Sequence, residues 1–191
     1  MKSMKYKFIV VEGVDGSGKS TICNWISQNY DYKKYKSIGN PFANVKNHFS
    51  PDKVTIQERF SFLCGEAINN SFIIKENTIK NQHIIFDRYY YSTIVYCESL
   101  EPGITDEFDY LFNKLPKPDL VLFVDVNYKT MMNRLSNRDE ITFIEQKFSE
   151  QDKFEILKRN YRKIIKSSNT MFIDNNSSLE SSIEQIKSIL E

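Results

Sequence analysis

Gly13-Val14-Asp15-Gly16-Ser17-Gly18-Lys19-Ser20 follows the apolar run Phe8-Ile9-Val10-Val11, and this stretch decides the fold. It fits the phosphate-loop template of Gly, four residues and Gly-Lys-Ser/Thr. The glycines let the backbone curl, so that several N–H groups can point at one phosphate chain. A helix expected to begin near Lys19 adds the positive end of its dipole. A Gly-rich turn that binds nothing is the alternative, but the fit at every position favours a nucleoside triphosphate site. Lys19 is expected to reach the outer phosphates and Ser20 to hold Mg²⁺.

Length and composition indicate a single domain over residues 1–191, with 40% hydrophobic and 27% charged residues. The net charge is +1 and no basic stripe stands out, so we expect no binding to long nucleic acid. Cys23, Cys64 and Cys97 lack metal-ligand spacing and indicate a reducing compartment. The chain runs directly into a strand and has no apolar run as long as a membrane span. We therefore predict a cytoplasmic protein that does not bind membranes.

Hydrophobic periodicity predicts strands that alternate with helices along the whole chain. Strands are expected at 6–11, 35–38, 83–86, 120–124 and 170–173. Helices are expected at 19–30, 55–79 with a break considered, 90–99, after Thr105, at 129–136, over 148–165 and around 183–190. This alternation predicts an α/β fold of three layers: a parallel sheet of about five strands, flanked by helices, with a nucleotide at the carboxyl ends of the strands.

A second motif, Asp87-Arg88-Tyr89, lies at the end of a predicted strand. An acid there can bind magnesium through water or accept a proton, and a neighbouring arginine can neutralise phosphate charge during transfer. An isolated Asp-Arg pair is more often a strand-end ion pair. A GTPase would need an Asn-Lys-x-Asp guanine reader, and Asn113-Lys114-Leu115-Pro116 lacks the aspartate. The pattern therefore favours a kinase over a GTPase.

Four segments resemble the thymidylate kinase family of nucleoside monophosphate kinases. They are 8–21, 87–96, 115–123 and the stretch from Arg134 through Arg138 to Gln146, in the order and spacing of the family. The resemblance implies a P-loop kinase fold and phosphorylation of dTMP to dTDP that depends on ATP and Mg²⁺. It also implies a homodimer, which could use helix faces around 60–68 and 91–96.

The resemblance also implies roles for individual residues. Asp15 helps to place the sugar and phosphate of the acceptor, Asp87 is the catalytic acid that shares Mg²⁺ with Ser20, and Arg88 binds the acceptor phosphate. Three residues match the wall of the family's acceptor pocket, around the base and sugar: Tyr89, Ser92 and Tyr96. Tyr96 lies where its ring can block a ribose 2′-hydroxyl.

One branch of the family carries an arginine inside the phosphate loop, where this chain has Gly16. The resemblance then implies that a lid over approximately 137–143 supplies the charge through Arg138, with Arg134 as its helix-borne partner. The catalytic set is Asp15, Lys19, Asp87, Arg88 and Arg138. The ATP-binding set is Gly13, Val14, Asp15, Gly16, Ser17, Gly18, Lys19, Ser20, Thr21, Arg134 and Arg138.

The acceptor side departs from the family pattern. Asn40-Pro41-Phe42-Ala43-Asn44 lacks the arginine that grips the acceptor phosphate. Counted back from Asp87, the base-stacking aromatic and the base-reading arginine are replaced by Leu63 and Ala67. Phe143 stands where the lid often has arginine.

Several alternatives stay open on the acceptor side. Pro41, Leu63 and Phe62 are candidate acceptor contacts, and Glu66 is either a different base reader or an exposed helix residue. There are two alternatives to dTMP phosphorylation. The acceptor is another pyrimidine monophosphate or a deoxynucleoside, or the protein is a largely non-catalytic nucleotide-binding module.

Overall fold

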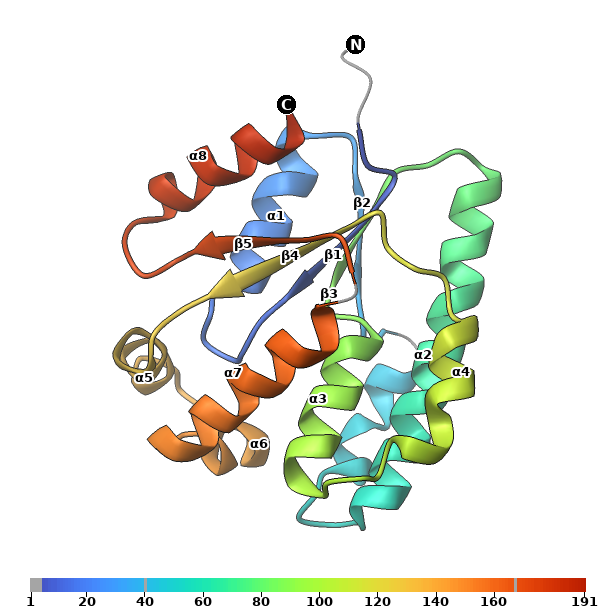
Figure 1. Ribbon diagram of the computed structural model, residues 1–191, viewed down its shortest axis with the longest axis vertical. Helices are drawn as coiled ribbons and strands as arrows, with labels where there is room; N and C mark the ends of the chain where they lie inside the picture. The colour runs from blue at the N-terminus through green and yellow to red at the C-terminus, as the bar shows by residue number, and fades with distance from the viewer. Residues whose placement is uncertain (1–4, 40, 167) are drawn as a thin grey trace.

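The computed structural model describes residues 5–39, 41–166 and 168–191, and it contains a five-stranded parallel sheet in the order β2-β3-β1-β4-β5 (Figure 1). The strands are β1 (Phe8–Glu12), β2 (Lys33–Lys36), β3 (Ile84–Asp87), β4 (Leu120–Asp125) and β5 (Thr170–Asp174). The helices are α1 (Lys19–Asn29), α2 (Ile56–Ile79), α3 (Tyr90–Leu100), α4 (Asp109–Lys114), α5 (Tyr128–Ser136), α6 (Phe143–Lys147), α7 (Gln151–Ile165) and α8 (Leu179–Leu190). The predicted α/β class and its parallel sheet are confirmed.

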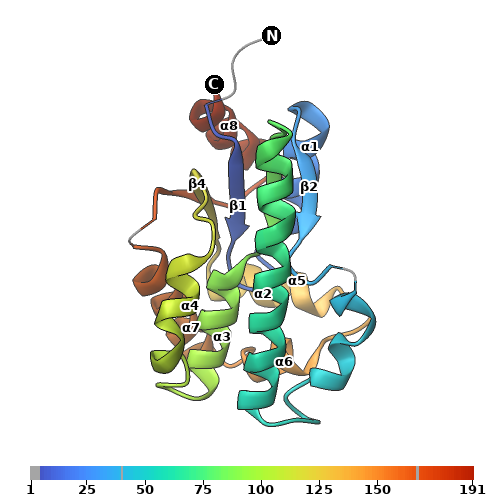
Figure 2. The same cartoon turned by 90° about the vertical axis from the view of Figure 1, so that its right-hand side faces the viewer.

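The central strands are apolar because helices cover both faces of the sheet. Ile9, Val11 and Val124 pack with residues of α1 and α8 on one face. Val10 and Phe86 lie in a larger core with residues of α2, α3 and α7 on the other face (Figures 1 and 2). All strands run parallel, so their carboxyl ends form a single edge of the sheet.

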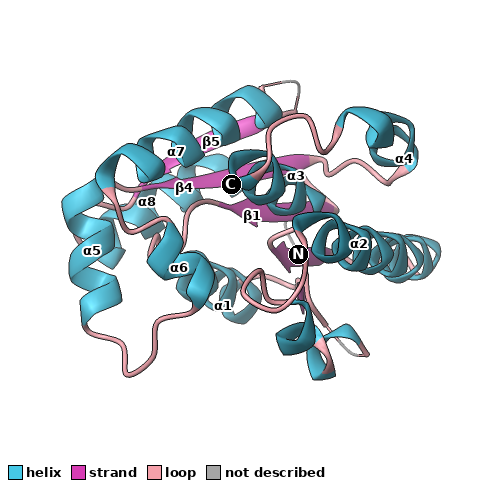
Figure 3. Ribbon diagram, turned by 90° about the horizontal axis from the view of Figure 1, so that it is seen from below, coloured by secondary structure: helices cyan, strands magenta, loops and turns pink. Residues whose placement is uncertain are grey.

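That edge carries the polar residues of the site. The phosphate loop joins the end of β1 to the start of α1, and Asp87 is the last residue of β3. Loop 137–142 joins α5 to α6 on one side of this edge, whereas α2 lies on the other side (Figure 3).

Several element boundaries differ from the expected ones for local reasons. α2 is unbroken, and it begins with a capping box between Thr55 and Glu58. The long helix expected over 148–165 begins only at Gln151, and a short α6 precedes it, opened by a second capping box of Thr142 with Glu145. Thr105 precedes a 3-10 turn instead of capping a longer helix. Asn40 lies outside the described residues.

No helix in the described part of the chain has both the length and the apolarity needed to cross a membrane.

Candidate active site

The phosphate loop has a backbone that only glycine allows at two positions. Gly13 and Gly18 have φ values of 147° and 94°. A Cβ atom on Gly13 would lie 2.5 Å from the Val124 carbonyl oxygen, and one on Gly18 would lie 2.5 Å from Asn175 Nδ2. Side chains at either position would therefore meet both backbone strain and neighbouring atoms.

Lys19 lies folded back into the loop that it closes. Its Nζ donates a hydrogen bond to the Val14 carbonyl oxygen at 2.6 Å, and the residue is 6% exposed. Burial and, to a smaller extent, the positive charge of Arg88 lower the pKa of Lys19 to about 8, against the opposing effect of Asp15. An ammonium group held in this way gains a strong partner when a phosphate chain enters the loop.

Ser20 and Asp87 meet where α1 begins and β3 ends. Ser20 Oγ donates to Asp87 Oδ2 at 2.6 Å. Both groups offer oxygen, the donor that Mg²⁺ prefers, and Mg²⁺ in kinases completes its shell with water and substrate phosphates. The pair therefore fits the ion that the resemblance implies.

Arg88 joins the phosphate loop to α3 and α7. Its Nη1 donates to the Gly13 carbonyl oxygen at 3.0 Å, to Ser92 Oγ at 2.9 Å and to Tyr161 Oη at 2.8 Å. Its Nη2 forms an ion pair with Asp15. Arg88 also has a φ of 71°, a conformation that non-glycine residues adopt rarely and chiefly at functional sites.

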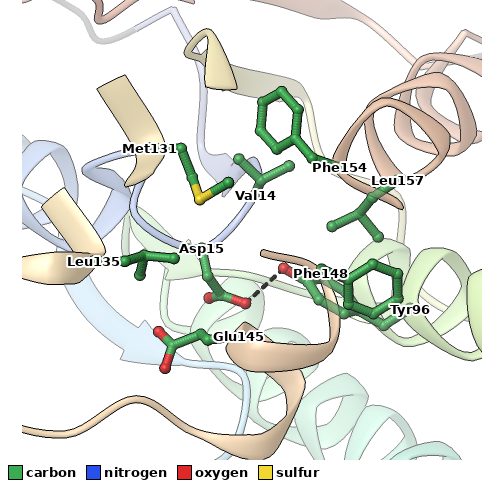
Figure 4. A pocket seen from close by; sticks show the side chains of 9 residues that line it. All are labelled: Val14, Asp15, Tyr96, Met131, Leu135, Glu145, Phe148, Phe154 and Leu157. Atoms are coloured by element: carbon green, nitrogen blue, oxygen red, sulfur yellow. Dashed lines mark hydrogen bonds between the residues drawn. The ribbon is translucent and has the colours of Figure 1, made fainter. Parts of the chain in front are cut away.

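Tyr96 completes the contacts of Asp15. Its Oη donates to Asp15 Oδ2 at 2.6 Å (Figure 4). Its ring centroid lies 5.3 Å from the Arg88 guanidinium. Burial alone would raise the pKa of Asp15, but Arg88 and Lys19 lower it to about 2. Asp15 is therefore ionised at neutral pH. Above it, apolar side chains of α5 and α7 line a cavity of about 10 Å³, barely the room of one water molecule.

Glu12 and Tyr161 also belong to this cluster, although neither is among the predicted site residues. Glu12 is fully buried and accepts hydrogen bonds from Ser92 Oγ at 2.6 Å and from the Tyr89 backbone N–H at 2.8 Å. Burial raises the pKa of Glu12, against the opposing effect of Arg88. A charged residue at the end of an otherwise apolar strand was an available signal for Glu12. Tyr161 lies on the apolar side of a helix and gave none.

The Tyr89 side chain lies apart from Ser92 and Tyr96, against the expectation that the three residues share one pocket wall. Its side chain is fully buried, and its ring packs against Phe8 and Phe86 at centroid distances of 5.7 and 5.9 Å. Its hydrogen bonds with the cluster are made by the backbone: the Tyr89 N–H donates to Glu12, and its carbonyl oxygen accepts from the Ser92 N–H at 3.1 Å.

Arg134 and Arg138 lie on the other side of the phosphate loop. Arg134 donates to the carbonyl oxygens of Ser17 at 3.1 Å and Asn175 at 2.8 Å. Arg138 is half-exposed and pairs with Glu145. Both arginines line a pocket of about 280 Å³, whose other lining residues are Gly16, Gly18, Thr21, Asn175 and Leu179. The pocket lies beside the phosphate loop and offers room for the rest of a nucleotide.

The predicted acceptor contacts of α2 and the preceding loop have other neighbours. Phe62 stacks on Phe49 with ring centroids 4.3 Å apart, so one face of its ring is covered. Leu63 lies in the apolar core, and Pro41 is exposed. The structure thus brings Asp15, Arg88, Ser92 and Tyr96 together, but it does not place these three residues in that cluster.

Glu66 is neither exposed nor free. It is 1% exposed, accepts a hydrogen bond from Ser37 Oγ at 3.1 Å and is bonded to Asn70, which also donates to the Ser37 carbonyl oxygen at 3.0 Å. Burial raises the pKa of Glu66 to about 8. These contacts hold the end of β2 against α2.

We expect Glu66→Gln to stabilise the protein at pH 8 and to leave it unchanged at pH 4.5. A carboxyl with a pKa raised from 4.5 to about 8 contributes stability below pH 4.5, and that contribution is lost as the pH rises through about 8. Between these two pH values the wild-type free energy of unfolding is expected to fall by on the order of 3–5 kcal/mol. Glutamine keeps both hydrogen-bond partners of Glu66 but carries no charge, so the variant avoids this fall. Urea unfolding at the two pH values measures the effect. Equal destabilisation at both values would contradict it.

Comparison with protein families supports a phosphotransferase site. A profile described as thymidylate kinase matches residues 11–186. A probable thymidylate kinase of Methanococcus maripaludis strain C7 is 31% identical over 170 residues, covering 87% of this chain and 81% of that protein. Probable thymidylate kinase 1 of Saccharolobus solfataricus is 27% identical over 197 residues, covering 97% of each chain.

Solved structures share the fold at lower identity. A thymidylate kinase from Candida albicans has a TM-score of 0.76 and 22% identity, covering 98% of this chain and 92% of that chain. A deoxyadenosine kinase from M. mycoides has a TM-score of 0.71 and 20% identity, covering 96% and 98%. At these identities, the two structures establish the architecture alone.

Proposed function

Because this chain belongs to the thymidylate kinase family, we propose that it transfers the γ-phosphoryl group of ATP to dTMP, forming dTDP and ADP. The observation that carries the proposal is the cluster of Asp15, Arg88, Ser92 and Tyr96 directly beside the phosphate loop. It supplies one cation, one carboxylate and one aromatic wall for an acceptor that carries a phosphate and a deoxysugar.

In the proposed reaction, an oxygen of the dTMP phosphate attacks the γ-phosphorus of ATP in line. The new O–P bond forms as the bond from the γ-phosphorus to the β,γ-bridging oxygen breaks, and ADP leaves. Lys19 and Arg138 stabilise the charge on the transferring group from the donor side, and Arg88 does so from the acceptor side. Arg134 binds ATP beside Arg138, and closure of loop 137–142 excludes water.

Ser20 and Asp87 would hold Mg²⁺ in this reaction, because they present adjacent oxygen atoms at the end of the phosphate loop. The bound ion would neutralise charge on the β- and γ-phosphates. The remaining proposed contacts to ATP come from Gly13, Val14, Gly16, Ser17, Gly18 and Thr21.

Tyr96 gives a physical basis for selecting deoxyribose. Its hydroxyl is bonded to Asp15 and its ring packs edge-on to Phe148 at 5.5 Å and to Tyr161 at 6.2 Å. A ring held from several sides cannot easily move aside for a 2′-hydroxyl. Contact of Pro41, Phe62 and Leu63 with the acceptor stays a prediction.

A coupled ADP-release assay with ATP and Mg²⁺ tests the function. The acceptors are dTMP, dUMP, dCMP, UMP, CMP, dGMP, thymidine and deoxycytidine. Selective turnover of dTMP is expected. Preference for a nucleoside or another monophosphate would show that dTMP is not the substrate. ATP binding without any turnover would indicate a nucleotide-binding module and not a kinase.

We also propose a homodimer, in which the interface uses the exposed face of α2. Phe60 and residues 91–96 are buried in the chain's own core, whereas Ile68, at the end of the suggested 60–68 face, is exposed. Phe72 and Ile79 extend this exposed face along the helix, with Phe72 at 64%. Their spacing places them along one side of the helix.

Phe72→Glu is expected to convert the dimer to a monomer, because it puts a charge in the centre of this apolar face. Light scattering after size-exclusion chromatography measures the mass. Tyr110→Glu, at a residue of α4 that is 75% exposed, is the matched control and should stay dimeric. A monomeric wild type, or a Phe72→Glu variant that remains dimeric, would contradict the proposal.

We propose a cytoplasmic location because the cysteines are free thiols. Cys23, Cys64 and Cys97 are buried free thiols, as a reducing compartment would maintain. Small-molecule nucleotides are the proposed partners.

A further inference from the structure

Asn175 joins the phosphate loop to the last helix of the chain. It follows β5, lies just before α8 and is 5% exposed. Its Nδ2 donates to the Ser17 carbonyl oxygen at 2.7 Å, and its Oδ1 accepts from Ser182 Oγ at 2.8 Å. Both polar atoms of the amide therefore have partners inside the protein, and one of those partners is the loop proposed to bind ATP.

This contact fixes the peptide between Ser17 and Gly18. Asn175 Nδ2 and Arg134 Nη1 both donate to the Ser17 carbonyl oxygen, at 2.7 and 3.1 Å. In a trans peptide, the C=O and the N–H point in opposite directions. Holding the carbonyl oxygen on Asn175 therefore turns the Gly18 N–H away from Asn175 and makes it available to a phosphate oxygen.

The packing around Gly18 is equally restrictive. A Cβ atom there would lie 2.5 Å from Asn175 Nδ2, so the amide occupies the space beside the glycine. Ser182 is fully buried and also donates to the Asp174 carbonyl oxygen at 3.1 Å, while the Asn175 N–H donates to the Asp125 carbonyl oxygen at 3.0 Å. The amide is thus held by β4, β5 and α8 in one orientation.

We propose that Asn175, supported by Ser182, is a positioning residue for the triphosphate: it sets the orientation of the Ser17–Gly18 peptide. The inference rests on the proposed function only in taking ATP as the donor. Asn175 lines the nucleotide pocket, but its amide atoms are engaged with Ser17 and Ser182. It therefore acts on the phosphates through the loop and does not read the base.

Calorimetric titration with Mg·ATP and with Mg·tripolyphosphate tests this assignment, because tripolyphosphate has no base. Asn175→Ala is expected to weaken both ligands by the same factor, about 3–10-fold, the usual effect of one lost hydrogen bond. Asn175→Asp should weaken both further, since a carboxylate would face the Ser17 carbonyl oxygen and the triphosphate. Ser182→Ala should have a smaller effect in the same direction. Ser181→Ala, on the exposed side of α8, is the matched control.

Two results would overturn the assignment. Unchanged affinity for both ligands, with a lower melting temperature, would make Asn175 a purely structural residue. A loss confined to ATP would make it a base reader. Binding is measured without turnover, so failure to phosphorylate dTMP would refute the proposed function and leave this test intact.

Discussion

Replacing Arg88 with alanine is expected to lower kcat/KM for dTMP by about 1,000-fold, because Arg88 supplies the acceptor-side cation of the proposed reaction. The variant also strands Asp15, whose pKa is held at about 2 in part by Arg88. The two side chains are 20% and 29% exposed, so we expect a destabilisation below the roughly 3–5 kcal/mol that follows when a fully buried ion pair loses one partner. Loss of activity in this variant therefore has to be separated from loss of folding.

Arg88→Lys makes that separation. Lysine keeps the positive charge beside Asp15 but cannot reproduce the planar fork that reaches Gly13, Ser92 and Tyr161 together. We expect a melting temperature close to wild type and a loss of about 100-fold in kcat/KM for dTMP, with little change in the dissociation constant of ATP. Arg162→Ala is the matched control, since its side chain is 58% exposed and pairs with Asp125 and not with a residue of the phosphate loop. An Arg88→Lys variant with wild-type turnover of dTMP would remove Arg88 from the proposed mechanism.

The parts of the molecule that depend on local patterns could be predicted from the sequence. The apolar run 8–11, the phosphate-loop glycines and the strand ending at Asp87 each carry their own signal. The parallel sheet follows from their alternation with helical segments. Even the split between α6 and α7 had a local signal, the capping box of Thr142 and Glu145.

The parts that depend on contacts distant in the chain could not be predicted. Tyr161 contacts Glu12, at the end of β1, across 149 residues of sequence. Asn175 contacts Ser17 of the phosphate loop across 158 residues. No local pattern marks either residue. The direction in which the Tyr89 side chain points could not be predicted either. It depends on the left-handed backbone conformation of Arg88, which the sequence Asp-Arg-Tyr does not reveal. Glu66 was ambiguous because its burial depends on Ser37 and Asn70.

Replacing Lys19 with methionine is expected to abolish most of the activity while making the free protein more stable. Methionine matches the apolar stem of lysine but carries no charge to place on the outer phosphates. The loss of kcat is expected to be about 100- to 1,000-fold, the range for removing one preorganised group that stabilises developing charge.

The stability gain follows from the same burial that prepares the site. Burial lowers the pKa of Lys19 to about 8, so at pH 7 the side chain is still protonated and the folded protein carries the cost of that buried charge. Removing it should raise the free energy of unfolding by about 1–3 kcal/mol. The Val14 carbonyl oxygen keeps a partner, because it also accepts from the Ser17 N–H at 3.2 Å.

Urea unfolding with and without Mg·ATP measures both effects on one protein. Wild type should be less stable than Lys19→Met without ligand and should gain more from Mg·ATP, because only wild type brings the ammonium to the phosphates. Lys158→Met is the control, since Lys158 is also buried but pairs with Asp125 and donates to the Val126 carbonyl oxygen at 2.8 Å. Its loss breaks one of the two ion pairs of Asp125 and leaves Arg162 as the remaining partner, so that variant should be destabilised and gain normally from Mg·ATP. If Lys19→Met behaved like Lys158→Met, Lys19 would be a structural cation, and its burial in the loop would not serve phosphate binding.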